Sequence, residues 1–527
     1  MKRLIRAVLS VTLCAATFAA GGLGFRAQES PPQAVTSPGI PTLLEYTGEA
    51  VTLSLQDVLK SALEKNLDIA VRRFDPKISE TRIETQEAAF SPSLTFSAKE
   101  SENNQPGSSQ LSGGAVVTDS NRTVAASYFE TFKIGSTFDF TVFTNRGSTT
   151  NSFSTVNPSY FSQALATYTQ SFLRNFGLSV NRTGIVIAQN NERISKSQFR
   201  QTVMDTLAAA EKSYWNLQFA IMDQKAKEAS LKLAQDFLEQ TRIKVRVGTL
   251  PPIEITQAEA EVADREEGII TGLAIIRAAE DILRLLINIP ADSPMWHQPI
   301  RPVDEPQVLD KLVNEDEALK TAFEKRPDLE QARLDLANRD ADLGYRRNQR
   351  LYRLDLIASY GAQGLAGDFL PSGPELSLGD SYSQIKDRDF STWSAELQLG
   401  IPLGNRAAEA AYAQSKYQQD QSKLGVQQLE QAAVVEVRNA VRQIETDLKR
   451  VKAAQVNTRL QREKLSAEQK KYENGMSTAF QVLQFQTDLT TARRRENLAV
   501  VDYNKDLVEL DRVLGILLDT RDVTVAY

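Results

Sequence analysis

The feature that most constrains the fold of this 527-residue chain is a set of long stretches without glycine or proline. Residues 185–247 give 63 such positions in succession, and residues 426–474 and 476–514 give 49 and 39 more. Glycine and proline are the residues that most often interrupt a helix. The stretches therefore predict helices far longer than the ~11–12 residues of an average globular helix. At ~1.5 Å per residue, the longest would extend for about 95 Å.

The apolar residues of these stretches are spaced for packing against another helix. They recur at alternating steps of three and four residues, which is the period of a coiled-coil seam. The seams are formed by Val203, Leu207, Ala210, Tyr214, Leu217 and Ile221, and by Val434, Val437, Val441, Ile444, Leu448 and Val451. Gly248 and Gly475 each separate two helical stretches, and a left-handed glycine can end a helix and reverse the chain. We expect two long helical hairpins with their tips near these glycines.

The two hairpins belong to two copies of one architecture. LKSALEKNLDI at residues 59–69 matches LKTAFEKRPDL at residues 319–329, with six identical positions in eleven. A second match aligns residues 244–263 with residues 471–490 and places the two hairpin glycines in register. The offset falls from 260 to 227 residues between the two matches, so the first copy contains about 33 additional residues. We expect them in the polar region before Asn175.

Segments that precede each hairpin alternate between apolar and polar residues. This period of two predicts strands with one apolar face, in residues 391–404 and 353–361 of the second copy and in STFDFTVFTN, LTFSA and ALATYTQ of the first. Such strands fit a sandwich, or a barrel with lipid outside and water inside. The intervening residues 101–123 and 364–384 are rich in Gly, Ser, Asn and Pro, and we interpret them as exposed loops.

Two principal strands in each copy make four per chain, and four strands cannot close a barrel. An open sheet edge is not tolerated in lipid, so strands that cross a membrane would have to share one barrel with other copies of the chain. Residues 111–160 contain further strand-like sequence, which leaves the exact number of strands open.

The N-terminus has the features of a secretory signal peptide. MKRLIRAVLSVTLCAATFAAGG combines a basic start, an apolar run and small residues, and cleavage is expected between Ala20 and Ala27. Cys14 is the only cysteine and would be removed with the signal, so the mature chain would have no disulfide. Leu13 argues against a lipoprotein signal at this cysteine. No later stretch approaches the ~18 apolar residues that a transmembrane helix requires.

These features divide the chain into six segments and define a fold class. The segments are a signal peptide (1–27), a Pro-rich leader (28–50), a first repeat (51–290, strands about 93–172, hairpin about 181–289), a linker (291–312), a second repeat (313–517, strands about 353–404, hairpin about 405–515) and a C-terminal tail (518–527). The expected fold is mainly α-helical with a β-barrel part, built from a duplicated unit of strands and long coiled-coil helical hairpins.

The reactive residues do not favour an enzyme, a metal site or a cofactor. His297 is the only histidine and lies in a Pro-rich linker, and we find no phosphate loop and no HExxH sequence. The Glu266–Glu267 pair is interpreted as part of a solvated helix face. The net charge of −6 argues against a nucleic-acid partner, which would require a basic surface.

The ordered set of motifs resembles the TolC family of outer-membrane efflux and secretion proteins. The resemblance lies in LSLQDVLKSALEKNLDIAVRRFD, EAAFSPSLTFSA, YTQSFLRNFG, EDEALKTAFEKRPDLEQARLDL, LGIPLGNRAAEAAYAQSKYQQ and the two glycine tips, and it covers residues 51–517. It implies a homotrimer in which three chains of four strands form one twelve-stranded barrel in outer-membrane lipid. The helices would continue as a hollow cylinder through the periplasm.

The same resemblance implies a function and its partners. The chain would be the exit duct of a tripartite efflux pump or a type I secretion system, working with a periplasmic adaptor and an inner-membrane transporter. The duct would be passive and would open at its helical tips. The implied adaptor contacts are Gly248, Thr249 and Leu250 in the first tip and Gly475, Met476 and Ser477 in the second.

A closed entrance would require residues at the tips that face the lumen. In the family, the second tip often has aspartates six and nine residues after the glycine, and here these positions are Gln481 and Gln484. The equivalent positions of the first tip are Glu254 and Gln257. Any charged ring would therefore come from Glu254, with Glu259 or Asp488 as candidate members further along, and a ring of carboxylates favours cations. The alternative is that Glu254 is an ordinary exposed carboxylate at a turn and that the glutamines pack between helices.

Two functions of other classes stay open on the sequence alone. A periplasmic coiled-coil adaptor or scaffold would usually have one helical hairpin flanked by compact β-domains, and the whole chain would be found in the soluble periplasm. An exported enzyme would require turnover that depends on one of the acidic pairs. The transported substrate is not identified by any residue pattern.

Overall fold

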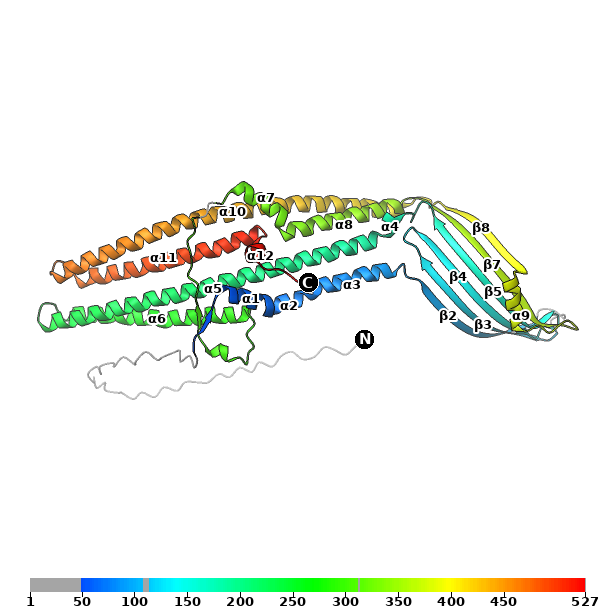
Figure 1. The fold of residues 1–527 in the computed structure, drawn as a ribbon, viewed down its shortest axis with the longest axis horizontal. Coiled ribbons are helices and arrows are strands. Elements are labelled where there is room, and N and C mark those ends of the chain that lie inside the picture. Colours follow the sequence, from blue (N-terminus) through cyan, green and yellow to red (C-terminus); the bar gives the residue numbers. More distant parts are fainter. Residues whose placement is uncertain (1–48, 108–112, 311–312, 527) are drawn as a thin grey trace, which may run out of the picture. The chain divides into compact units, whose positions relative to one another are not determined.

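The computed structural model describes residues 49–107, 113–310 and 313–526, all within one compact unit that spans residues 46–527. The expected signal peptide and nearly all of the expected leader lie outside the described residues. In this unit, long helices run side by side and a six-stranded sheet lies at one end of them (Figure 1). Among the described residues, no helix combines the length and the hydropathy that a membrane-spanning helix requires.

The first repeat runs from short helices through four strands into a long helical hairpin. Its elements are β1 (Val51–Leu53), α1 (Leu55–Lys65), α2 (Leu67–Arg72), α3 (Phe74–Ala88), β2 (Ser93–Pro106), β3 (Val116–Thr131), β4 (Ser136–Thr149), β5 (Val156–Ser171), α4 (Leu178–Asn181), α5 (Thr183–Arg246) and α6 (Ile253–Leu286). Ser54 begins α1 with a capping box, in which its hydroxyl accepts from the Asp57 N–H at 3.1 Å. The helix therefore starts at Leu55, before the repeated phrase at residues 59–69.

The second repeat follows the same order with two strands. Its elements, after a linker with η2 (Pro294–His297) and β6 (Ile300–Pro302), are α7 (Glu315–Lys325), α8 (Pro327–Gln349), β7 (Arg353–Phe369), α9 (Leu378–Asp387), β8 (Phe390–Gly400), α10 (Arg406–Glu473), α11 (Ala479–Val513) and α12 (Leu517–Thr520). β6 pairs in parallel with β1. The duplicated, mainly helical fold with long hairpins is thus confirmed.

The main sheet contains six strands, so the expectation of four principal strands is wrong. The strand order is β2-β3-β4-β5-β7-β8, and all neighbours are antiparallel. Much of the expected loop at residues 101–123 is strand, because residues 101–106 pair with residues 116–121. The expected loop at residues 364–384 likewise begins inside β7 and ends inside α9. A strand that faces water on both sides needs no apolar residues, so its composition resembles that of a loop.

One face of the sheet is mainly apolar and the other is mainly polar. Directly paired residues of neighbouring strands lie on the same face. One directly paired row consists of Leu94, Tyr128, Phe140, Ala166, Tyr360 and Trp393. The neighbouring row on the opposite face consists of Thr95, Ser127, Thr141, Leu165, Gly361 and Thr392. On the apolar face Trp393 is 76% exposed and Phe96 is 74% exposed. An apolar face exposed to this degree indicates contact with lipid or with another protein surface.

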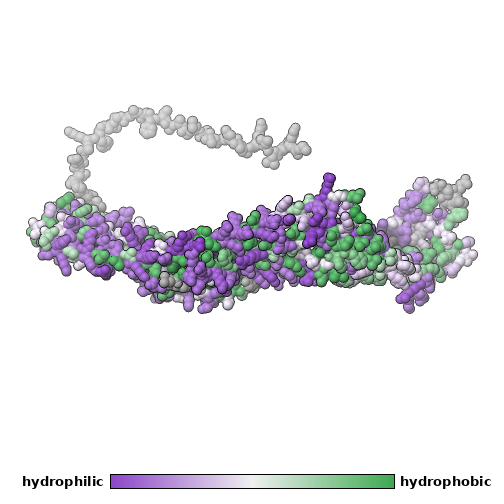
Figure 2. All heavy atoms as spheres, turned by 90° about the horizontal axis from the view of Figure 1, so that it is seen from above, coloured by the Kyte–Doolittle hydropathy of each residue, from purple (hydrophilic) through white to green (hydrophobic). Residues whose placement is uncertain are grey.

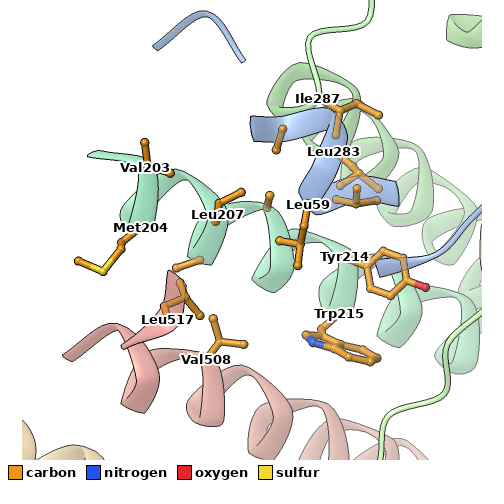
Figure 3. Packing of buried hydrophobic residues seen from close by; sticks show 14 of the residues in the cluster. Leu59, Val203, Met204, Leu207, Tyr214, Trp215, Leu283, Ile287, Val508 and Leu517 are labelled. Atoms are coloured by element: carbon orange, nitrogen blue, oxygen red, sulfur yellow. The ribbon is translucent and has the colours of Figure 1, made fainter. Parts of the chain in front are cut away.

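The helices are held together by an apolar cluster midway along them. It joins α5 to α1, α6, α11 and α12, with Leu59, Val203, Leu207, Tyr214, Leu283, Val508 and Leu517 among its members (Figure 3). Five of the six predicted seam residues of α5, all except Ile221, are fully buried. Each large aliphatic side chain stabilises the fold by about 1.5–3 kcal/mol when it leaves water. By contrast, hydrophilic side chains cover most of the face of the long helices that Figure 2 shows, with smaller hydrophobic areas between them.

Candidate functional site at the helical hairpin tips

Both long hairpins turn at the predicted glycines. Gly248 and Gly475 have φ angles of +79° and +75°, in the left-handed region that other residues rarely adopt. The backbone bonds that close the helices are Thr249 N–H to Lys244 O and Met476 N–H to Lys471 O, both at 2.9 Å. A Cβ atom at either glycine would meet no atom within 4 Å, so the requirement for glycine is conformational rather than steric. The two tips are equivalent in backbone geometry.

The two tips differ in the way that the returning helix begins. In the first tip, Pro251 and Pro252 precede α6, and the fixed φ of proline suits the start of a helix. In the second tip, the Thr478 hydroxyl accepts from the Gln481 N–H and begins α11. The side chain of Thr249 in the first tip is bound locally, because its hydroxyl donates to Lys244 O at 2.8 Å.

A small polar network fixes the second tip. The Ser477 hydroxyl lies 2.6 Å from one Glu468 oxygen, and Lys471 Nζ lies 3.1 Å from the other. The hydrogen bond from Ser477 and then the ammonium of Lys471 lower the pKa of Glu468 from its ordinary value. Ser477 also lies 3.0 Å from Gln481 Oε1. These bonds connect the last turn of α10 to the first turn of α11, whereas Met476 between them is 71% exposed.

The two hairpins contact each other near their tips through α5 and α10. Tyr472 lies 5.3 Å from Phe237 between ring centres, and Lys244 Nζ lies 3.9 Å from the centre of the Tyr472 ring. These aromatic residues belong to an apolar cluster near the tips that also includes Leu238, Ala258, Leu465, Ala479, Val482, Leu483 and Leu489, with Leu250 packed against it. Leu250 is therefore partly buried by this packing.

Glu254 is turned toward the second hairpin. Its Oε2 atom is buried and has no hydrogen-bond partner in the described part of the chain, and the hydroxyl of Tyr472 is buried beside the side chain of Thr241. Burial raises the pKa of Tyr472, and the negative charge of Glu254 raises it further. The carboxylate and the phenol therefore lie within electrostatic reach of each other. The structure brings together Glu254, predicted from the sequence, and Tyr472, which was not.

The three glutamines of the predicted entrance lie on the surface. Gln257, Gln481 and Gln484 are all exposed in the single chain. The amide of Gln484 donates to Asp488 Oδ1 at 3.2 Å, one turn further along α11. Gln257 extends from α6, so these side chains come from both hairpins.

Sequence reasoning missed a set of polar contacts that joins the two hairpins between the cluster near the tips and the midway cluster. This set is here called the interhairpin seam. Its contacts are Asp223 with Arg494 at 3.4 Å, Ser230 with Thr490 at 2.8 Å, and Arg265 with Thr487 at 3.0 Å. Arg265 is buried and also contacts Ser230 and Glu261. The sequence contained one signal of buried polar contacts. Gln224 occupies the next seam position of α5, three residues after Ile221, and the structure buries it.

The seam and the midway cluster differ in what their separation would require. Groups that are hydrogen-bonded in the seam can exchange their partners for water, and such bonds contribute only about 0.5–1.5 kcal/mol net. Apolar side chains of the midway cluster cannot replace their contacts by hydrogen bonds to water, so their separation exposes apolar surface at a cost in free energy. The interhairpin seam can therefore separate more readily than the midway cluster, whereas opening of the tips themselves must also expose the apolar cluster near the tips. Within the described ranges, no group of three or more His, Cys, Asp or Glu residues is placed to bind a metal.

Several solved outer-membrane channels share this fold at low sequence identity. The CmeC channel of Campylobacter jejuni superposes with a TM-score of 0.63 at 14% identity, covering 88% of this chain and 86% of the channel. A membrane protein from Pseudomonas aeruginosa gives 0.64 at 18% identity, with 91% and 98% covered. The open state of MtrE from Neisseria gonorrhoeae gives 0.58 at 19% identity, with 88% and 89% covered. No curated protein matches the chain.

The sequence itself matches one protein family over both repeats. The match to the family described as outer membrane efflux protein covers residues 137–288 and 318–516, which include both helical hairpins and most of the sheet. It agrees with the duplicated architecture, because each matched range contains the end of a strand region and one complete hairpin. The chain therefore belongs to the outer membrane efflux protein family.

Proposed function

We propose that three copies of this chain form a channel-tunnel in the outer membrane, which serves as the exit duct of a tripartite efflux pump or of a type I secretion system. The strands of the three copies would close one barrel, and the helices would continue it as a hollow cylinder through the periplasm. The duct is passive and opens at its helical tips. Energy would come from an inner-membrane transporter, joined to the duct by a periplasmic adaptor.

The observation that supports this proposal is a two-faced sheet with open edges. In the described part of the chain, β2 and β8 are each paired on one side only. The outward face is apolar around Phe96 and Trp393, but unpaired backbone groups in lipid cost several kcal/mol each. The two edges run in opposite directions, so β8 of one copy can pair in antiparallel fashion with β2 of the next. Closure by further copies removes both edges.

The entrance of the duct is proposed at the two tips. Gln257, Gln481 and Gln484 would face the lumen, with Glu254 as the charged member of the ring. The buried orientation of Glu254 toward Tyr472 supports a second role, in which the two residues hold the hairpins together in the closed state. Opening would separate the interhairpin seam while the midway cluster stays packed.

The tips are also the proposed contact surface for the adaptor. Gly248 and Gly475 shape the two turns, and Thr249, Leu250, Met476 and Ser477 surround them. Met476 is the most exposed large side chain among these six residues. An exposed methionine is well suited to a contact that must adapt, because its side chain is flexible and polarizable.

Electron microscopy of the detergent-purified mature chain tests this proposal. The expected particle has threefold symmetry, a barrel of membrane height and a helical cylinder about 100 Å long, the length that ~64 helical residues allow. A monomer, or a rod without a lumen, would contradict it. That outcome, together with a location wholly in the soluble periplasm, would favour a coiled-coil adaptor or scaffold.

A further inference from the structure

The hairpin formed by β3 and β4 has no counterpart in the second repeat. The second repeat has two strands, β7 and β8, between its entry helix and its long hairpin, whereas the first repeat has four. β3 and β4 span residues 116–149, which is close to the 33 additional residues that the internal alignment assigns to the first repeat. The two repeats would have equal strand numbers without this hairpin.

The additional hairpin is part of the sheet rather than an appendage to it. β3 pairs with β2 from Val116 to Phe129, and β4 pairs with β5 from Ser136 to Gly147. The hairpin therefore separates β2 from β5. Since β2 and β5 run in opposite directions, they would be direct neighbours without it, as β7 and β8 are.

The hairpin continues both faces of the sheet. On the polar face, Asn145 bonds to Thr123 and to Asn121, both at 3.1 Å, and Ser127 bonds to Thr141 at 2.9 Å. On the other face, the middle of the hairpin presents an apolar band formed by Val124, Ala126, Tyr128, Phe138, Phe140 and Val142. A plug or a lid would not need one face for each environment, so it would not maintain this alternation. The hairpin therefore has the pattern of a sheet strand pair that forms part of the barrel wall.

We infer that the β3–β4 hairpin sets the width of the membrane part of the duct, because it adds two strands per copy to the barrel wall. Each copy would supply six strands to the barrel instead of two per repeat, and the circumference would be 1.5 times that of a barrel without the hairpin. Three copies would close eighteen strands. The inference rests on the proposed function, but the ratio of six to four is independent of the number of copies.

The widths of the sheet and of the helical layer support this inference. Strands about 4.8 Å apart and tilted by about 40° each occupy about 6.3 Å of circumference, so six strands occupy about 38 Å per copy. Four helices, α3, α5, α8 and α10, connect directly to these strands and pack in that order. At about 10 Å between axes they occupy about 40 Å. Four strands at the same tilt would occupy only about 25 Å.

The functional consequence concerns the size of the cargo. An exit as wide as the helical cylinder does not select by size, and selection is left to the hairpin tips. The membrane part of the duct would therefore pass bulkier solutes than the same channel without the hairpin. The polar face of the hairpin offers such cargo hydroxyl and amide side chains together with the carboxylates of Asp119 and Asp139.

A reconstruction of the purified channel at a resolution that separates strands provides the first test. Six strands per copy in the barrel wall, with residues 116–149 among them, are expected. A closed wall of four strands per copy with residues 116–149 outside it would overturn the inference and leave the proposed function intact. The absence of any closed ring would instead overturn the proposed function.

Polymer access from the sheet end provides the second test, because it is independent of the closed tips. Thr167→Cys places a thiol on the polar face of β5, and Ala166→Cys places one on the apolar face as a control. Intact cells are treated with maleimide-polyethylene glycols of increasing size, with the unsubstituted chain reporting background. The Thr167→Cys channel should accept polymers of about 1.5 times larger radius than the same channel lacking residues 116–149. Equal cut-offs would overturn the inference, and if the deletion does not assemble, the reconstruction decides.

Discussion

Lys244 Nζ lies 3.9 Å from the centre of the Tyr472 ring, so the last turn of α5 is in direct contact with the last turn of α10. The contact joins the two hairpins within one turn of their tips. The same tyrosine packs against Phe237 and faces the buried oxygen of Glu254. If the duct opens at its tips, Tyr472 must leave at least one of these partners.

Replacing Tyr472 by alanine should therefore loosen the closed tip. The ring contributes a cation–π contact of about 0.5–2 kcal/mol and an aromatic pair of about 0.5–1.5 kcal/mol, and both are lost. We expect larger and more frequent openings in single-channel recordings from planar bilayers. Tyr472→Phe is the matched control, because it keeps the ring and removes only the hydroxyl, so it should conduct more like the unsubstituted channel than Tyr472→Ala does. Equal conductance of all three channels would show that the contact does not hold the tip.

Glu254→Gln tests the charged member of the entrance. Replacement of the carboxylate by an amide of the same shape should reduce the preference for cations, which is measured as a shift of the reversal potential across a salt gradient. Glu259→Gln is the control on the same helix, because Glu259 is exposed and paired with Arg242 at 2.8 Å. A shift of the same size in both variants would assign the selectivity to the overall charge of α6 rather than to a ring at position 254.

Arg265→Ala should weaken the interhairpin seam. The buried guanidinium contacts Ser230, Glu261 and Thr487. Its removal takes a partner from the polar groups of these residues, and each buried group left unsatisfied lowers the stability by about 1–3 kcal/mol. We expect faster exchange of backbone amide hydrogens in the parts of α5 and α11 that lie nearer the tips. Exchange around Tyr214 should be unchanged. The control is Arg242→Ala, which removes an exposed pair within a single hairpin. Unchanged exchange in both variants would argue that the seam contributes nothing to closure.

The pairing of α10 with α11 should depend on pH through Asp506. Burial and then a hydrogen bond with Asp447 raise the pKa of Asp506 to about 7, well above its ordinary value of 3.8. The folded chain therefore holds a proton that the unfolded chain releases, so this contribution to stability is fully present below pH 3.8 and is lost as the pH rises through about 7.

Thermal unfolding at pH 5 and at pH 8 measures this dependence. The unsubstituted chain should unfold at a lower temperature at pH 8, and Asp506→Asn should reduce the difference, because asparagine resembles the protonated acid. Asp420→Asn provides the comparison, because Asp420 is an exposed carboxylate of the same hairpin. A pH difference that persists in Asp506→Asn would place the titrating group elsewhere.

Met476→Asp should weaken attachment of the periplasmic adaptor. The side chain is exposed at the second tip, and a charge there would have to be desolvated in the interface. Reduced co-purification of the adaptor, with the amount of assembled channel unchanged, is the expected outcome. Met476→Leu keeps an apolar side chain of similar volume and should retain the adaptor. If Met476→Asp binds the adaptor normally, the contact lies away from this tip.

The sequence by itself determined the duplicated architecture and the ends of the hairpins. The apolar spacing of three and four residues requires a partner helix wherever it occurs, and it predicted the buried face of α5 from Val203 to Leu217. Gly248 and Gly475 were found because a left-handed turn between two long helices admits few other residues. These features are local, so they can be recognised in one stretch of chain.

Tertiary structure alone decided the number of strands and the contacts between the hairpins. Residues 101–104 and 118–121 are polar on both faces, and only their mutual pairing identifies them as strand. Tyr472 meets Lys244 and Glu254, and Arg265 meets Thr487, across more than 200 positions of sequence. Such contacts depend on the rotation of each hairpin about its axis, which the packing of the midway cluster fixes and which no local pattern reports.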